Sequence, residues 1–293
     1  MELFNQFNEE YGPGVIDRTV SMETQAILCA IPEEHSNSEH LKRIFSLIDL
    51  TTLNSDDNDA TARRFTGRLN SFEAAFPGIP QVAAICVYPS LVEEVKKTLT
   101  DTRVSIAAVG AGFPASQTFL AVKLAECELL VKKGADEIDV VISVGRFLAG
   151  EDKAVLNELI LIRDACRGVK LKVILETGLL KTAQKIRTAS ILAMEAGADF
   201  IKTSTGKNTV SATPEAVYVM ALAIRDFYAR TGRAVGIKPA GGISGVEDSI
   251  VYYSLISKIL GNAWLNPELF RIGASRLANN LLTRLNNQEI NYF

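Results

Sequence analysis

Three ionisable side chains, Asp139, Lys202 and Lys238, each stand in a short, otherwise apolar segment that has the character of a buried strand. Burial removes the water that stabilises a charge, and a lone buried lysine responds with a lowered pKa. A structural ion pair without catalytic duty would explain one such residue. Two lysines and an aspartate on separate strands cost stability unless they are used, so we favour a catalytic cluster.

Two lysines and a carboxylate can form and use an imine. A neutral amine attacks an aldehyde, and the protonated imine then withdraws electrons from the neighbouring carbon. The second lysine keeps the first partly unprotonated near neutral pH, while the carboxylate moves protons. The spacing leaves open which lysine attacks. The two histidines, His35 and His40, both lie near the N-terminus, so a histidine-ligated zinc site or a Ser-His-Asp triad later in the chain is not expected.

A second constellation consists of small-residue turns that follow three predicted strands. Glycines let backbone N–H groups approach an anion closely, and a nearby lysine adds a positive charge. In barrels of parallel strands, phosphate is commonly held by the loops after strands 7 and 8 and by a helix N-terminus. One such turn alone is a weak signal, but three at one barrel face favour a phosphate site. The turns are Ser204-Thr205-Gly206-Lys207, Ala240-Gly241-Gly242 and Gly273-Ala274-Ser275.

Short β-branched segments alternate with longer amphipathic ones along most of the chain. Eight strands separated by helices predict a parallel sheet, and eight is the number that closes a (β/α)8 TIM barrel. A doubly wound open sheet is the alternative, but no G-x-G-x-x-G follows the first strand. The predicted strands are 44–49, 82–87, 105–109, 137–142, 170–175, 200–204, 235–238 and 270–273, and the predicted helices include 116–133, 152–167, 182–196 and 214–230.

The segment that precedes Asp139 resembles the segment that precedes Lys202. In each, a helix ends, Gly-Ala-Asp turns the chain and a strand begins, at residues 134–136 and 197–199. Gly-Ala-Asp is by itself merely a good turn between a helix and a strand. The equivalent positions of Asp139 and Lys202 are more informative, because they predict that both side chains face the same way.

Composition limits the remaining possibilities. A formal net charge of -3 over 293 residues gives no general attraction to nucleic acid or to an anionic membrane. The four scattered cysteines suit a reducing compartment. The acidic N-terminus lacks the apolar region of a signal peptide, and no apolar run approaches the ~18 residues of a membrane span. We therefore expect a cytoplasmic protein of class α/β with an N-terminal extension (1–40, helical near 22–30, with a linker at 32–38), a catalytic barrel (41–285) and a mobile C-terminal tail (286–293).

At these residues the sequence closely resembles the deoxyribose-phosphate aldolase family, over roughly residues 41–285. The order of the lysine motifs carries most of the resemblance. The matching motifs are Leu47-Ile48-Asp49-Leu50-Thr51-Thr52-Leu53, Cys86-Val87-Tyr88-Pro89, Gly112-Phe113-Pro114, Glu137-Ile138-Asp139-Val140-Val141, Glu176-Thr177-Gly178, residues 200–207, residues 238–242 and residues 271–275.

The resemblance implies roles that spacing leaves open. It implies that Lys202 forms the Schiff base, that Lys238 lowers the pKa of Lys202, and that Asp139 transfers protons. Its implied reaction is the reversible cleavage of 2-deoxy-D-ribose 5-phosphate to D-glyceraldehyde 3-phosphate and acetaldehyde, with no metal and no cofactor. The partners expected are the phosphorylated sugar and the aldehyde, and a second copy of the chain in a homodimer. The substrate-binding residues implied are Asp49, Cys86 and Thr203 around the sugar, and Thr205, Gly206, Lys207, Gly241, Gly242 and Ser275 near the phosphate.

Two positions depart from familiar members of that family. Ser143 stands where many members carry asparagine, and Arg276 where some carry a second serine. These departures, with the longer N-terminal segment, leave two alternatives. One is a non-catalytic barrel that binds a sugar phosphate, although such a protein would have no use for the costly lysine cluster. The other is a different imine-forming aldolase, which would act on ketose phosphates.

Overall fold

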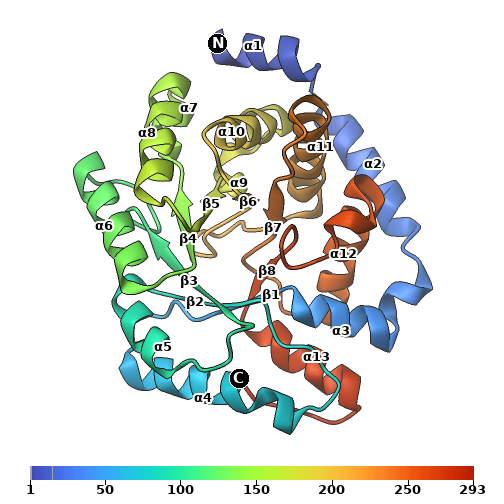
Figure 1. The fold of residues 1–293 in the computed structure, drawn as a ribbon. Helices are drawn as coiled ribbons and strands as arrows, with labels where there is room; N and C mark the ends of the chain where they lie inside the picture. The colour runs from blue at the N-terminus through green and yellow to red at the C-terminus, as the bar shows by residue number, and fades with distance from the viewer. Residues whose placement is uncertain (1, 15) are drawn as a thin grey trace.

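The computed structural model describes residues 2–14 and 16–293. Within this part of the chain, eight parallel strands lie side by side in the order β7-β6-β5-β4-β3-β2-β1-β8. Isolated bridges from Ile237 to Phe270 and from Ala240 to Gly273 join β7 to the β8 side, so that the sheet is nearly closed. Figure 1 shows the strands at the centre with helices around them. The predicted (β/α)8 TIM barrel is confirmed.

The strands are β1 Ile48–Thr51, β2 Ala84–Val87, β3 Ser105–Gly110, β4 Glu137–Val141, β5 Lys170–Ile174, β6 Phe200–Lys202, β7 Gly236–Lys238 and β8 Ile272–Ala274. The α-helices are α1 Glu2–Tyr11, α2 Asp17–Cys29, α3 Ser38–Ser46, α4 Asp59–Ala75, α5 Val92–Thr98, α6 Leu120–Lys133, α7 Val144–Leu148, α8 Asp152–Ala165, α9 Thr177–Leu180, α10 Ala183–Glu195, α11 Pro214–Thr231, α12 Val246–Leu260 and α13 Arg276–Asn286. The described residues also form the 3-10 helices η1 Glu33–Ser36, η2 Pro89–Leu91 and η3 Asn262–Trp264.

The first predicted strand, 44–49, begins too early. Residues 44–46 are the last turn of α3, and β1 starts at Ile48. Leu41, Ile44 and Phe45 are buried on one face of α3, with the three- and four-residue spacing of an amphipathic helix. The apolar residues up to Phe45 therefore follow the spacing of a helix and not that of a strand. The predicted helix 116–133 also begins too early, because Ser116 has a positive φ of 58° and the helix starts at Leu120.

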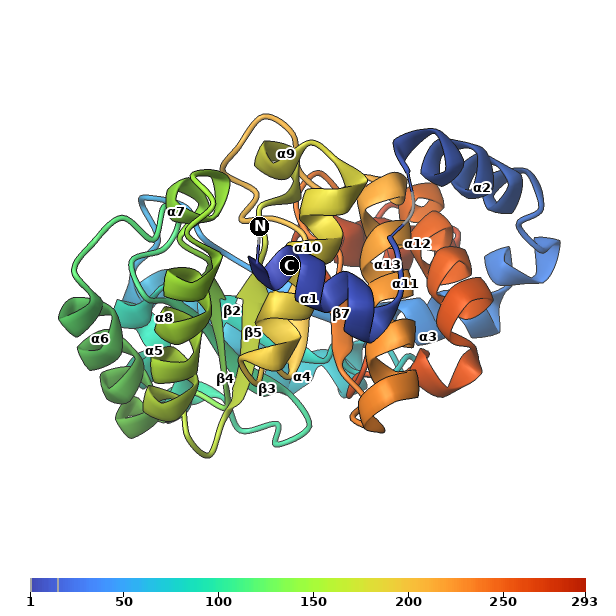
Figure 2. The same ribbon diagram turned by 90° about the horizontal axis from the view of Figure 1, so that it is seen from above.

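The N-terminal extension contains more structure than the predicted single helix. Helix α2 covers residues 17–29 and packs against α11 and α12, and α1 contacts α10 and α11. Figure 2 shows α1 lying across this side of the barrel. The predicted linker contains η1, in which His35 is buried and its Nδ1 lies 2.8 Å from Oγ of Ser254. Among the described residues, no helix has the length and apolar character required to cross a membrane.

The C-terminal residues are packed against α4, whereas the sequence predicts a mobile tail. The hydroxyl of Tyr292 donates a hydrogen bond to the carbonyl of Arg68 at 2.7 Å. The ring of Phe293 stacks on Phe72, with centroids 5.8 Å apart. The two terminal aromatic side chains account for this ordered end, because burying aromatic surface offsets the entropy lost by ordering a chain end.

Candidate active site

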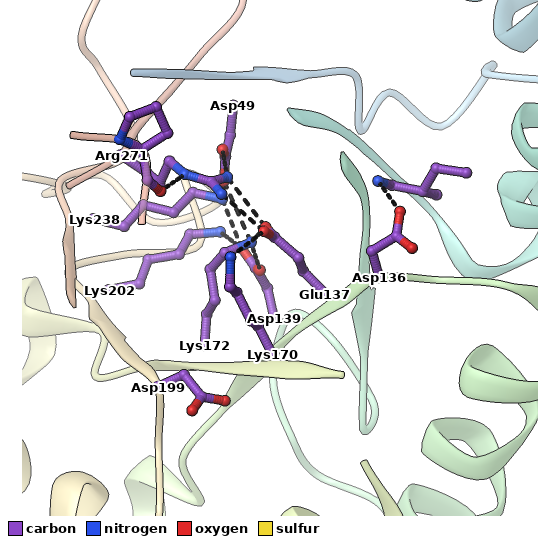
Figure 3. A network of polar contacts seen from close by, with 12 residues as sticks. Asp49, Asp136, Glu137, Asp139, Lys170, Lys172, Asp199, Lys202, Lys238 and Arg271 are labelled. Atoms are coloured by element: carbon purple, nitrogen blue, oxygen red, sulfur yellow. Dashed lines mark hydrogen bonds and ion pairs between the residues drawn. The ribbon is translucent and has the colours of Figure 1, made fainter. Parts of the chain in front are cut away.

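The repeated Gly-Ala-Asp turn sets the register of the two strands that carry the catalytic candidates. Gly134 and Gly197 end their helices in the left-handed region, with φ of 95° and 94°. The carboxylate of Asp136 then accepts a backbone N–H of β3 at 2.8 Å, and that of Asp199 accepts a backbone N–H of β5 at 2.8 Å. Each aspartate thus anchors its strand to the preceding one, and the side chain three positions later points into the barrel (Figure 3).

Seven charged side chains meet inside the barrel (Figure 3), and we call them the buried charge cluster. They come from β1, β4, β5, β6 and β7 and from the residue before β8, and each is at most 3% exposed. The cluster consists of Asp49, Glu137, Asp139, Lys172, Lys202, Lys238 and Arg271.

The two predicted catalytic lysines share one oxygen of the predicted catalytic carboxylate. Lys202 and Lys238 are paired in register on β6 and β7, and each donates from Nζ to Oδ2 of Asp139 at 2.8 Å. Lys238 has a second carboxylate partner, Oδ2 of Asp49, at 2.5 Å. The structure therefore brings together the three residues that the sequence singles out.

A cavity of about 430 Å³ opens above the cluster at the carboxyl ends of β1, β6, β7 and β8. Of the seven cluster residues, Lys202 lines this cavity, whereas Lys238 is 0% exposed and does not. A ligand in the cavity can reach the amine of Lys202 without displacing Lys238. This placement distinguishes two lysines that the sequence pattern alone leaves equivalent.

The pKa values of the two lysines move in opposite directions. Burial lowers the pKa of Lys202, and the charge of Lys238 lowers it further, against the attraction of Asp139. Burial also opposes the charge on Lys238, but Asp139 and Asp49 together outweigh burial and raise its pKa. Burial likewise opposes ionisation of Asp139, yet Lys172, Lys202 and Lys238 hold its pKa well below the usual range. The site thus favours a neutral amine on Lys202, beside an ammonium group and a carboxylate.

All the residues that the sequence predicts near the phosphate line the same cavity. Gly206, Gly241 and Gly242 have positive φ angles of 76°, 83° and 78°, a backbone conformation found in turns that bind anions through N–H groups. Lys207 adds a positive charge at the rim, where its Nζ donates to the carbonyl of Leu53 at 2.5 Å. The predicted residues at the cavity are Thr205, Gly206, Lys207, Gly241, Gly242 and Ser275.

The structure does not place the three predicted sugar-binding residues at the cavity wall, because each is fully buried. Asp49 belongs to the buried charge cluster. Cys86 packs in an apolar group with Leu53 and Val109, and burial raises the pKa of its thiol. Thr203 donates to the carbonyl of Ala240 at 3.2 Å and accepts its N–H at 3.0 Å, which joins the loops after β6 and β7.

Sequence reasoning missed several members of the site. Glu137, Lys172 and Arg271 were assigned no role, although Lys172 stands between apolar residues in a predicted strand. The two-residue spacing of Lys170 and Lys172, which places both side chains on one face of the strand, was the sequence signal for this role. In the barrel, Lys172 pairs in register with Asp139. Arg64, Arg68 and Phe293, which the sequence analysis did not single out, also line the cavity. Among the described residues, no group of three or more His, Cys, Asp and Glu side chains is arranged to hold a metal ion.

Comparison with known proteins connects this geometry to one family. The sequence model of the DeoC/LacD family aldolases matches residues 43–252. The deoxyribose-phosphate aldolase of Homo sapiens is 44% identical over 252 residues, which are 82% of this chain and 79% of the human protein. That of Bos taurus is 45% identical over 248 residues, or 81% and 78% of the two chains. The structure of the tetrameric deoxyribose phosphate aldolase from Aeropyrum pernix is similar in fold, with a TM-score of 0.66, 24% identity and coverage of 88% and 96%.

Proposed function

Because the chain belongs to the DeoC/LacD family of aldolases, we propose that it reversibly cleaves 2-deoxy-D-ribose 5-phosphate to D-glyceraldehyde 3-phosphate and acetaldehyde. The observation that carries this proposal is the amine of Lys202, which lines the cavity and lies 2.8 Å from Asp139. An aldolase of this kind needs an uncharged amine at the carbonyl carbon, and the lowered pKa of Lys202 favours that form.

In the proposed mechanism, Nζ of Lys202 attacks C1 of the open-chain sugar, and loss of water gives a protonated imine. Removal of the proton from the C3 hydroxyl breaks the C2–C3 bond. Its electron pair moves toward the imine nitrogen, which leaves an enamine on Lys202 and releases D-glyceraldehyde 3-phosphate. Protonation of the enamine carbon and addition of water then release acetaldehyde and restore the amine. Asp139, held between Lys202 and Lys238, is the group placed to take and return protons.

We propose that the phosphate lies in the part of the cavity bounded by Gly206, Lys207, Gly241, Gly242 and Ser275. Ser275 precedes α13, whose N-terminal N–H groups favour an anion. Arg276, which stands where some family members carry a second serine, lines the same cavity and carries a guanidinium. These donors support binding of a phosphorylated sugar over its unphosphorylated analogue.

We expect Gly241→Ala to raise the KM for the phosphorylated sugar by about tenfold or more, which corresponds to the loss of one charge-assisted contact. Gly241 has a φ of 83°, and a Cβ there would lie 2.6 Å from Oγ of Ser211 and 3.0 Å from Cα of Gly206. The loop must shift, and its donors shift with it. Steady-state kinetics on 2-deoxyribose, with and without the 5-phosphate, measures the effect.

The matched control is Gly150→Ala, because Gly150 has the same φ of 83° with nothing within 4 Å of an added Cβ, and it does not line the cavity. This variant carries the same backbone strain and should keep the KM of the unaltered chain. If Gly241→Ala has the same KM as the unaltered chain for the phosphorylated sugar and also for the unphosphorylated sugar, the proposed phosphate position in this part of the cavity is contradicted.

The direct test of the proposed activity is product analysis. The purified chain is incubated with 2-deoxy-D-ribose 5-phosphate, and acetaldehyde and D-glyceraldehyde 3-phosphate are quantified against time. Equal amounts of both products are expected. Cleavage of ketose phosphates without cleavage of the 2-deoxy sugar would instead assign the chain to a different imine-forming reaction.

We also propose that the chain forms a homodimer in the cytoplasm. Exposed apolar side chains at and just before α6 support self-association, since Phe119, Val122 and Leu129 are 81%, 51% and 53% exposed. All four cysteines are free, as suits a reducing compartment. Light scattering coupled to size-exclusion chromatography measures the assembly, and a monomeric mass at micromolar concentration would contradict the dimer.

A further inference from the structure

Lys172 is a third lysine in the buried charge cluster, and the proposed mechanism gives it no step. It lies on β5 and is 0% exposed. Its Nζ lies 2.9 Å from Oδ1 of Asp139, 2.5 Å from Oε2 of Glu137 and 3.4 Å from Oδ2 of Asp49 (Figure 3). Lys172 therefore occupies the oxygen of Asp139 that Lys202 and Lys238 leave free.

The Glu137 carboxylate that contacts Lys172 is itself held by Arg271. Arg271 donates from Nη2 to Oε1 of Glu137 at 2.8 Å and from Nη1 to Oε2 at 3.1 Å, and its Nη1 also lies 2.6 Å from Oδ1 of Asp49. This two-point contact fixes the plane of the Glu137 carboxylate, which in turn holds Lys172. The position of the Asp139 carboxylate is thereby set by three side chains that do not line the cavity.

The charges of the cluster do not balance when every group is ionised. Its three carboxylates face four bases, so that full protonation leaves one surplus positive charge. Burial makes that surplus costly. Lys172 contacts three carboxylates and Lys238 contacts two, whereas Lys202 contacts Asp139 alone and shares the oxygen with Lys238. Lys202 is consequently the base that loses its proton at the lowest cost.

Other ionisable groups near the cluster leave this balance unchanged. The pKa of Cys86 is raised by burial, which keeps the thiol neutral. Lys170 lies 3.7 Å from Glu137 but is partly exposed and paired with Glu268 at 2.7 Å. Glu176 accepts hydrogen bonds from Thr205 at the cavity edge. Lys207 donates a hydrogen bond from Nζ to the carbonyl of Leu53 at the rim of the cavity.

We propose that Lys172 is a positioning residue of the aldolase reaction. Its ammonium group holds Oδ1 of Asp139 and supplies the surplus positive charge that makes Lys202 the neutral amine. This inference rests on the proposed role of Lys202 as the attacking amine. It gives Lys172 a defined task without contact with the substrate, and it assigns Glu137 and Arg271 to holding Lys172 in place.

The test measures kcat/KM against pH for Lys172→Met, Glu137→Gln and the unaltered chain. The quantity compared is the midpoint, which is the pH at which kcat/KM reaches half of its alkaline plateau. Removing a cation favours protonation of Lys202, so Lys172→Met should move this pH upward by about one unit or more, with at least about a tenfold loss at neutral pH that alkaline buffer recovers. Removing a negative charge at Glu137 should move it downward. A merely structural role would lower the rate at every pH without opposite shifts.

Two further variants complete the experiment. Lys172→Arg keeps the charge and should keep the midpoint of the unaltered chain. Lys123→Met is the matched control, because Lys123 is 1% exposed, is paired with Glu158 at 2.8 Å and has no contact with the cluster. It should lower the melting temperature and leave the midpoint where it was.

The inference is overturned if Lys172→Met leaves the midpoint unchanged or lowers it. Circular dichroism shows whether Lys172→Met folds. If it does not fold, Glu137→Gln is the deciding variant, because an unchanged or higher midpoint in Glu137→Gln contradicts the charge balance. Borohydride trapping of the unaltered chain separates this failure from failure of the proposed function. No adduct on Lys202 in the unaltered chain overturns the function, whereas an adduct together with unshifted variants overturns the role of Lys172 alone.

Discussion

The variant Lys202→Leu is expected to lose turnover by a factor on the order of 10⁴ or more, as removal of a covalent nucleophile commonly does. Leucine provides no amine for the imine, and the cavity offers no substitute, because Lys238 and Lys172 are fully buried. The fold should persist. Asp139 keeps Lys172 and Lys238 as partners at 2.9 and 2.8 Å, so that no carboxylate of the cluster is left unpaired.

A coupled assay for D-glyceraldehyde 3-phosphate measures the loss, and circular dichroism measures the fold. Lys185→Leu is the control, because Lys185 is exposed on α10 and should be replaced without loss of turnover. Turnover within tenfold of the unaltered chain in a folded Lys202→Leu protein would mean that another group attacks the carbonyl.

The second large effect is expected for Lys238→Met, which should lower kcat/KM at neutral pH by a factor on the order of 10², with recovery as the pH rises. Lys238 places an ammonium group 2.8 Å from the oxygen of Asp139 that it shares with Lys202, and its charge lowers the pKa of Lys202. Without that charge, the pKa of Lys202 rises, and less of its amine is neutral at neutral pH. At alkaline pH the amine becomes neutral again, so the activity returns.

The pH dependence of kcat/KM measures this effect and separates the two lysines. Lys202→Leu should stay inactive at every pH, whereas Lys238→Met should regain activity in alkaline buffer. A loss in Lys238→Met that is the same across the pH range would assign Lys238 a direct chemical step instead of an electrostatic one.

The barrel could be predicted from the sequence because its signals are local. Alternating apolar segments predicted the eight strands, and the repeated Gly-Ala-Asp turn predicted that Asp139 and Lys202 face the same way, as the ion pair at 2.8 Å between them shows. The boundary of β1 was wrong for a local reason too. Ile44 and Phe45 fit a strand by residue type, but their burial follows the period of α3.

The buried charge cluster could be predicted only in part, because its contacts depend on register around a closed sheet. Arg271 contacts Glu137 across 134 positions of the chain, and no pattern within one strand indicates such a partner. The charge on Lys172 was visible in the sequence, but its position opposite Asp139 requires the pairing of β4 with β5. The placement of Lys202 at the cavity, with Lys238 buried below it, likewise becomes visible only in three dimensions.

Trapping of the imine tests the central claim most directly. The chain is incubated with acetaldehyde and sodium borohydride, digested, and mapped by mass spectrometry. The account predicts one reduced two-carbon adduct per chain, on Lys202, and none in Lys202→Leu. An adduct on Lys238 or Lys172, or no adduct while the chain cleaves its substrate, would contradict it.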